Sequence, residues 1–60
     1  MENVVNVLVE SIATQMWTLV RESEHRGMYR HNDWAWCIEN MPRTADHLRS
    51  KARTALNLAG

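Results

Sequence analysis

The sequence is poor in the residues that cross-link or interrupt a small fold. It has one cysteine, one proline and two glycines in 60 residues. The single cysteine excludes a disulfide within the chain, and a lone thiol is typical of a reducing intracellular compartment. A chain of this length buries only about 60% of the surface that its unfolded form exposes, so a monomer would be marginally stable. Without a disulfide, we expect a second copy of the chain to supply the missing core.

Long apolar runs and a basic leader are also lacking. No uninterrupted apolar run approaches the roughly 20 residues that are needed to span a bilayer. The segment from Met1 to Val5 lacks the basic stretch that precedes the apolar run of a secretory signal. We therefore expect a soluble, cytoplasmic protein with no membrane partner.

The chain has no net charge, but its two signs are segregated. Residues 1–40 carry six acidic against three basic side chains, a net charge of −3, whereas residues 41–60 carry four basic against one acidic, a net charge of +3. Either the two halves neutralise each other within the fold or dimer, or a basic element meets an acidic partner. Overall neutrality disfavours a nucleic-acid binder, whose domain pI usually exceeds about 9.

The pattern of apolar residues predicts a single all-α domain over residues 1–60, with a long, a short and a medium helix. The first helix is expected from about Asn3, as its N-cap, to Arg26, with Gly27 as its stop. A stripe of apolar side chains recurs along this helix at spacings of three and four, as on one helical face. The residues of the stripe are Val5, Leu8, Ile12, Met16 and Leu19.

The apolar face of this first helix is wider than the stripe. Four further residues extend it to about half of the circumference, against a usual width of roughly 100°. These residues are Val9, Ala13, Trp17 and Val20. Two shorter helices would not cover such a face, whereas the same face of a second copy would. The sequence therefore predicts a homodimer, intertwined or paired through the helix over 3–26, with the stripe from Val5 to Leu19 as its interface.

The second helix is expected to be capped by Asn32 or Asp33 and to end at about Asn40, because Pro42 disfavours helix in the residue before it. Its apolar face is formed by Trp34, Cys37, Ile38 and Met41. Trp36 lies off that face and is expected to point elsewhere.

The third helix is expected to open at Pro42 or Thr44 and to run to about Leu58. It carries a narrow seam of mostly small residues within an arc of roughly 100°. The seam residues are Ala45, Leu48, Ala52, Ala55, Leu56 and Ala59. Small side chains allow close approach, so we expect this helix to lie tightly against one of the other two.

Catalysis and metal binding find little support in the pattern. Cys37 would be buried on the apolar face of its helix, where a thiol has a raised pKa and low reactivity. A zinc site needs local ligand pairs such as CxxC or HxxxH, and the spacing His25-x5-His31-x5-Cys37-x9-His47 contains none. We expect no enzyme activity, no metal and no other cofactor.

Large aromatic side chains are frequent for a chain without phenylalanine, and tryptophan, tyrosine and arginine dominate binding hot spots. Trp36 is close in sequence to Tyr29 and Arg30, which suggests an exposed partner-binding surface. The alternative is that every aromatic belongs to the core or the dimer interface. Basic residues of the third helix would steer an acidic partner. These residues are Arg49, Lys51 and Arg53.

The sequence favours a small protein-binding module, an inhibitor or regulator that occludes a surface of a partner protein. In size and style it resembles the short helical proteins by which phages and plasmids inhibit host factors, a likeness that rests on no motif. The alternative is a small dimeric DNA-binding regulator with a helix-turn-helix-like unit over 32–58. A short second helix and a turn without glycine disfavour it. The contacts to DNA would come from Arg43, Thr44, His47, Ser50 and Lys51.

Overall fold

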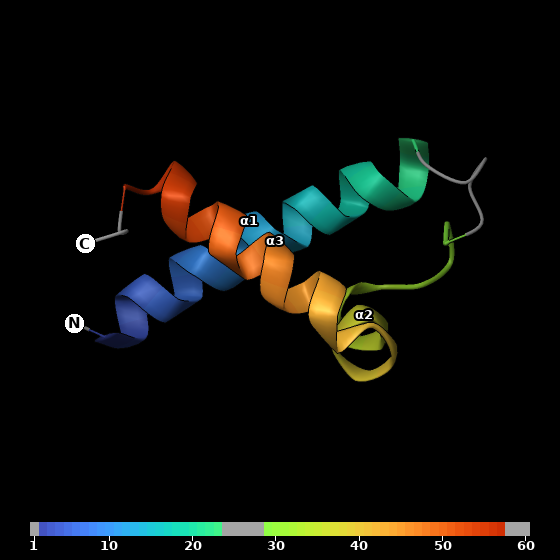
Figure 1. Ribbon diagram of the computed structural model, residues 1–60, viewed down its shortest axis with the longest axis horizontal. Coiled ribbons are helices and arrows are strands. Elements are labelled where there is room, and N and C mark those ends of the chain that lie inside the picture. The colour runs from blue at the N-terminus through green and yellow to red at the C-terminus, as the bar shows by residue number, and fades with distance from the viewer. Residues whose placement is uncertain (1, 24–28, 58–60) are drawn as a thin grey trace.

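A computed structural model of the chain describes residues 2–23 and 29–57. Within these ranges the regular elements are three helices, α1 (Glu2–Ser23), α2 (Trp34–Asn40) and α3 (Pro42–Ala55). The all-α, three-helix prediction is confirmed. α1 and α3 run in opposite directions and cross, so that the first turn of α1 and the last turn of α3 lie at one end and α2 at the other (Figure 1). The molecule is elongated, measuring 37 × 18 × 16 Å.

The start of α1 differs slightly from its prediction. The helix begins at Glu2, so Asn3 lies inside it and the predicted N-cap is wrong. The first turns are helical although they contain β-branched valines, which shows that structural context outweighs the weak intrinsic helix propensity of these residues. The predicted end at Arg26 and the stop at Gly27 lie outside the described residues.

α3 is shorter than predicted at its C-terminus. It ends at Ala55, and the backbone N–H of Leu56 still donates to the carbonyl of Ala52 (3.0 Å). Asn57 then adopts a left-handed backbone with φ 59°, a conformation that terminates helices and that asparagine tolerates. The expected continuation to Leu58 is wrong because this local turn precedes it.

The corner between α2 and α3 is built from one residue. Met41 donates its N–H to the carbonyl of Cys37 (2.8 Å), and its own carbonyl accepts from Ala45 (3.0 Å). Pro42 follows as the first residue of α3, where a helix needs no backbone donor. At the other end of α2 the Asp33 carboxylate accepts from the backbone N–H of Trp36 (2.8 Å). Both predicted boundaries of α2 are confirmed.

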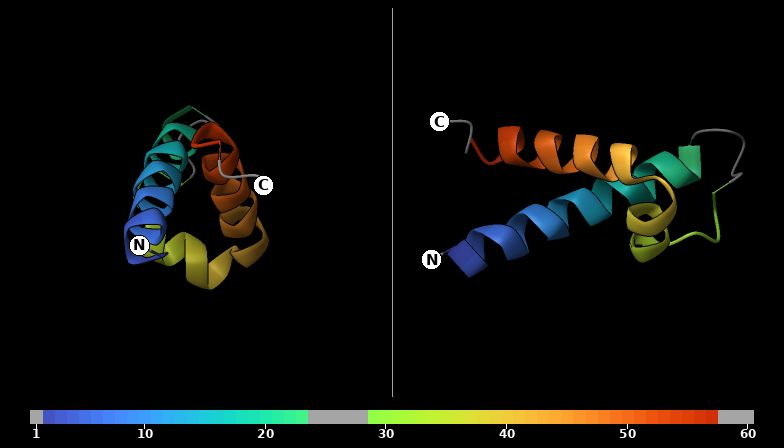
Figure 2. Two further views of the ribbon diagram at one scale, coloured as in Figure 1. Left: turned by 90° about the vertical axis from the view of Figure 1, so that its left-hand side faces the viewer. Right: turned by 60° about the horizontal axis from the view of Figure 1, so that its bottom comes forward.

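The core lies where the three helices meet, and Figure 2 shows their triangular arrangement in end view. Its buried residues are Val9, Ala13, Trp17, Cys37, Ala45, Leu48 and Ala52. Three of these seven are alanines, so α1 and α3 approach closely and little apolar volume is enclosed. Three residues of the predicted seam of α3 are confirmed as buried, namely Ala45, Leu48 and Ala52. Ala55 lies nearer the C-terminal end of α3 and is exposed.

The row of α1 that faces the core is not the predicted stripe but the row beside it. Val9, Ala13 and Trp17 recur every four residues and are buried. Ala13 lies at the point where α1 crosses the alanine seam of α3. With Ala13 in that position, the stripe of α1 lies to one side of the core. Leu8 and Leu19 are consequently exposed. The other stripe residues, Val5, Ile12 and Met16, are half-buried at the edge of the core.

Candidate functional site

An aromatic cluster joins α1 to the segment around α2. The Trp36 ring stacks on Trp17 with centroids 6.3 Å apart and planes inclined by 21°. Tyr29 lies 5.7 Å from Trp17 and 5.8 Å from Trp36. Trp17 is buried, whereas Tyr29 and Trp36 are half-buried against it. Trp36 was expected to point away from the packed side of its helix, and this is wrong because Trp17 provides a broad flat surface for it.

The cluster is positioned by the carbonyl of Asn32. This oxygen accepts from the Trp17 indole N–H (2.8 Å) and from the Arg21 guanidinium (3.1 Å). The Asn32 N–H in turn donates to the carbonyl of Tyr29 (2.9 Å) and closes a turn. The segment that enters α2 is thereby attached to the C-terminal half of α1. A buried indole N–H needs an acceptor, which was the available sequence signal for this contact.

Arg30 is exposed and follows the half-buried Tyr29 in the sequence. We call Tyr29, Arg30 and Trp36 the aromatic surface. The structure thus brings Tyr29 and Trp36 together, as the sequence suggested. Their rings contribute to the core on one side and reach solvent on the other.

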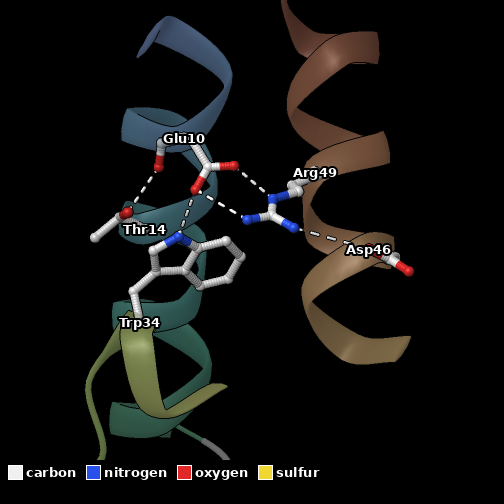
Figure 3. Close-up of polar contacts among 5 residues, drawn as sticks. All are labelled: Glu10, Thr14, Trp34, Asp46 and Arg49. Carbon is white, nitrogen blue, oxygen red and sulfur yellow. Dashed lines mark hydrogen bonds and ion pairs between the residues drawn. The ribbon is translucent and has the colours of Figure 1, made fainter. Parts of the chain in front are cut away.

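A polar network ties the three helices together on the side of α1 marked by Glu10 (Figure 3). The Glu10 carboxylate of α1 accepts two hydrogen bonds from the Arg49 guanidinium of α3, one from Nε and one from Nη2 at 3.2 Å. It also accepts from the indole N–H of Trp34 in α2 (2.8 Å). The Arg49 guanidinium carbon lies 5.4 Å from the centre of the Trp34 ring, a cation–π contact.

The network shifts both charged groups toward their ionised forms. The hydrogen bonds from Arg49 lower the pKa of Glu10, burial opposes this, and the hydrogen bond from Trp34 adds to the lowering. The hydrogen bond to Glu10 raises the pKa of Arg49, with a further contribution from Asp46, 3.9 Å away. Arg49 was expected to steer a partner, but its side chain is held within the fold. This pair is one instance of the two halves of the chain neutralising each other.

The sequence signal for this network was the isolation of Glu10. It is the only charged residue between Asn3 and Val20. A single carboxylate in a long helical stretch otherwise without charge is a candidate for an internal partner, since a solvated helix face usually carries several charges. Neither Arg49 nor Trp34 could be assigned as that partner from spacing alone.

The remaining predicted basic residues lie apart. Lys51 and Arg53 are both exposed, but at about 100° per residue they point to nearly opposite sides of α3. They therefore do not form one patch with each other. Lys51 instead shares the outward face of α3 with Arg43 and His47, which are also exposed and precede it at intervals of four residues.

The solvent side of α1 carries large apolar side chains among uncharged polar ones. Among the described residues, the exposed large hydrophobic side chains include four on α1, namely Val4, Val7, Leu8 and Leu19, and Ile38 on α2. The helix carries no charged residue on this side between residues 4 and 19. A surface helix normally presents charged side chains to water. This face therefore has the composition of a protein contact.

Groups with reactive or coordinating chemistry are not assembled into a centre in the described part of the chain. Cys37 is fully buried, and burial raises the pKa of its thiol, which leaves it a poor nucleophile. No group of three His, Cys, Asp or Glu within residues 2–23 and 29–57 could hold a metal ion. His25 lies outside these ranges. In the same ranges no helix is both long enough and apolar enough to cross a membrane.

Comparison with protein families, with curated proteins and with solved structures finds no match to this chain. Function must therefore be argued from the surfaces themselves. Two of them have the chemistry of macromolecular contacts, the apolar side of α1 and the aromatic surface.

Proposed function

We propose that the protein is a small non-enzymatic binding module, which acts as a cytoplasmic homodimer and inhibits or regulates a partner protein by covering part of its surface. The observation that carries this proposal is the exposure of Leu8 and Leu19 in the uncharged apolar stripe of α1. Single exposed apolar residues are normal on protein surfaces. Several gathered on one helix mark a site of protein interaction.

The homodimer is proposed to form through the stripe of α1, from Val5 to Leu19. Among the described residues, the buried core has few large side chains, since three of its members are alanines and the larger ones are Val9, Trp17 and Leu48. Such a core provides little hydrophobic stabilisation for a chain of 60 residues. A second α1 would cover Leu8 and Leu19 and complete the burial of Val5, Ile12 and Met16.

The dimer is tested by sedimentation equilibrium of two matched variants. Leu19 and Val7 are both 66% exposed, but Val7 lies more than about 100° around the helix from Leu19, outside the stripe. Leu19→Glu places a charge in the interface and should give the mass of one chain, 7.0 kDa, because burying an unpaired charge is costly. Val7→Glu should keep twice that mass. A monomeric wild type would refute the dimer.

The partner protein is proposed to bind at the aromatic surface of Tyr29, Arg30 and Trp36. Rigid rings and an arginine are the side chains that most often dominate interfaces. Arg30 is exposed and adjacent in sequence to Tyr29. The exposed Lys51 and Arg53 would contribute to the approach of an acidic partner through the overall field rather than through contact.

Partner binding is tested by affinity capture from cell lysate with nuclease present. The wild type is compared with Arg30→Glu, which alters the aromatic surface without removing a packed ring, and with Thr54→Ala, an exposed change at the far end of α3. We expect a protein that is retained by the wild type and by Thr54→Ala and lost with Arg30→Glu. If no nuclease-resistant protein shows this dependence, the occlusion proposal fails.

A second candidate function is DNA binding by α3. It is favoured by the outward face of this helix, where Arg43, His47 and Lys51 are exposed and spaced for phosphate contacts. The one-residue corner at Met41 disfavours it, since a helix-turn-helix joins its helices by three or four residues. Under this alternative, Arg43→Gln with Lys51→Gln should weaken DNA binding and reduce its salt dependence. Titration of labelled duplex DNA at two salt concentrations distinguishes the two functions.

A further inference from the structure

The apolar stripe of α1 is symmetric along the helix. Its residues, Val5, Leu8, Ile12, Met16 and Leu19, are separated by three, four, four and three positions, so the spacing reads the same in both directions from Ile12. The stripe covers about 21 Å of helix at 1.5 Å per residue. It lies roughly 160° around the helix from Glu10, whose carboxylate is tied to α2 and α3. Neither of these helices covers Leu8 or Leu19.

We propose that this stripe binds the same stripe of a second copy in antiparallel orientation, with the two-fold axis at Ile12. The inference rests on the proposed homodimer and specifies its geometry. In this pairing Val5 meets Leu19 of the other copy, Leu8 meets Met16, and Ile12 meets itself. Every apolar side chain of the stripe then opposes another apolar side chain.

Side-chain volume favours this orientation over a parallel pair. The antiparallel layers combine valine with leucine and leucine with methionine, so their volumes are similar along the interface. A parallel pair would set Val5 against Val5, leaving that layer underfilled relative to the others. Facing positions pack best when large and small residues alternate across them.

Helix dipoles favour the antiparallel orientation, and the accessible area favours association. Antiparallel helices place each positive N-terminal end beside a negative C-terminal end, whereas parallel helices place like ends together. A compact monomer of 7.0 kDa is expected to expose about 4,000 Å², and this chain exposes 4678 Å². The excess is comparable to the roughly 600–800 Å² that each partner buries in a small stable interface.

The antiparallel pair separates the two aromatic surfaces. Each is attached to the C-terminal half of its own α1 through Trp17 and Asn32, and these halves point in opposite directions along the shared pair. One dimer would therefore hold two partner molecules, one at each end. The expected stoichiometry is two chains of this protein to two of the partner.

Disulfide trapping tests the orientation directly. In the antiparallel pair, residues 8 of the two copies are offset by about 12 Å along the helix axis, and Cα atoms more than about 7 Å apart cannot be bridged. Leu8→Cys and Met16→Cys are therefore prepared as separate proteins, unfolded and refolded together, and oxidised. The wild type, whose native Cys37 is fully buried, serves as the control.

We expect a cross-linked heterodimer from the mixture, none from either variant alone, and a cross-linked homodimer from Ile12→Cys. Cross-linking of Leu8→Cys alone would show a parallel pair and overturn the orientation while keeping the dimer. No cross-link in any sample, together with a monomeric wild type in sedimentation, would reject the dimer itself. Should Met16→Cys lose helical circular dichroism, the pair Val5→Cys and Leu19→Cys replaces it with the same expected outcomes.

Discussion

At the scale of single residues, the contact between Glu10 and Arg49 connects positions 39 apart in the sequence and is part of a network with Trp34. Both charged side chains remain partly exposed, at 40% and 33%. Solvent screening therefore limits what the ion pair contributes to stability. Its clearest consequence is geometric, since one carboxylate receives donors from two other helices and fixes their positions along α1.

The network predicts acid sensitivity. Because the pKa of folded Glu10 lies below its ordinary value of 4.5, the contribution to stability is fully present above about pH 4.5 and is lost as pH falls toward the folded pKa. Urea unfolding between about pH 3 and about pH 6 should show this loss in the wild type and a flatter profile in Glu10→Gln. Glu39→Gln, at an exposed position of α2, should retain the profile of the wild type. Equal profiles for Glu10→Gln and the wild type would contradict the assignment.

Trp17 is the largest fully buried side chain and should be the most sensitive position in the chain. Trp17→Ala is expected to cost about 3–5 kcal/mol, a large share of the 5–15 kcal/mol typical of small domains. Trp17→Phe retains most of the apolar contact and removes one hydrogen bond to the Asn32 carbonyl, which keeps Arg21 as a donor, so this variant should lose about 0.5–1.5 kcal/mol. Chemical unfolding followed by circular dichroism measures both. An ordinary single mutation lowers the free energy of unfolding by about 1 kcal/mol. If Trp17→Ala lowers it by no more than that, the aromatic cluster is not central to the core.

At the scale of elements, the boundaries of α2 were predictable because their causes are local. Asp33 and Pro42 act on the backbone within a few residues, so the sequence alone places them. The row of α1 that enters the core was not predictable in this way. The stripe and the buried row both have helical spacing, so the sequence pattern does not distinguish them. Which of them enters the core depends on which fits against the alanines of α3. Trp36 was misplaced for the same reason, since its stacking partner Trp17 is 19 positions away.

The cap of α2 gives a prediction at this scale. Asp33 accepts a hydrogen bond from the N–H of Trp36 at 2.8 Å, and replacing an N-cap side chain by alanine costs about 1 kcal/mol. Asp33→Ala should therefore lower the free energy of unfolding by that amount. Asp33→Asn, which keeps an acceptor oxygen, is expected to stay close to the wild type. Equal losses in both variants would mean that the charge of Asp33, rather than its capping bond, matters.

At the scale of the whole molecule, an elongated chain with a core rich in alanine is expected to depend on association. If folding is coupled to dimer formation, the melting temperature should rise with protein concentration, because mass action favours the associated native state. Leu19→Glu should melt at a lower temperature that is independent of concentration, while Val7→Glu should follow the wild type. Thermal scans over a hundredfold range of concentration decide this. A wild-type melting temperature that does not change would indicate that the monomer is self-sufficient.

The stacked indoles of Trp17 and Trp36 also give the folded protein a spectroscopic signature. Two like chromophores 6.3 Å apart and inclined by 21° couple their electronic transitions, whereas Trp34 lies in a separate polar network. The ultraviolet spectrum of the protein should therefore contain a paired band that neither indole produces alone. That band would vanish in Trp36→Phe and persist in Trp34→Phe. The chain thus carries its own optical label at the junction between α1 and the segment around α2.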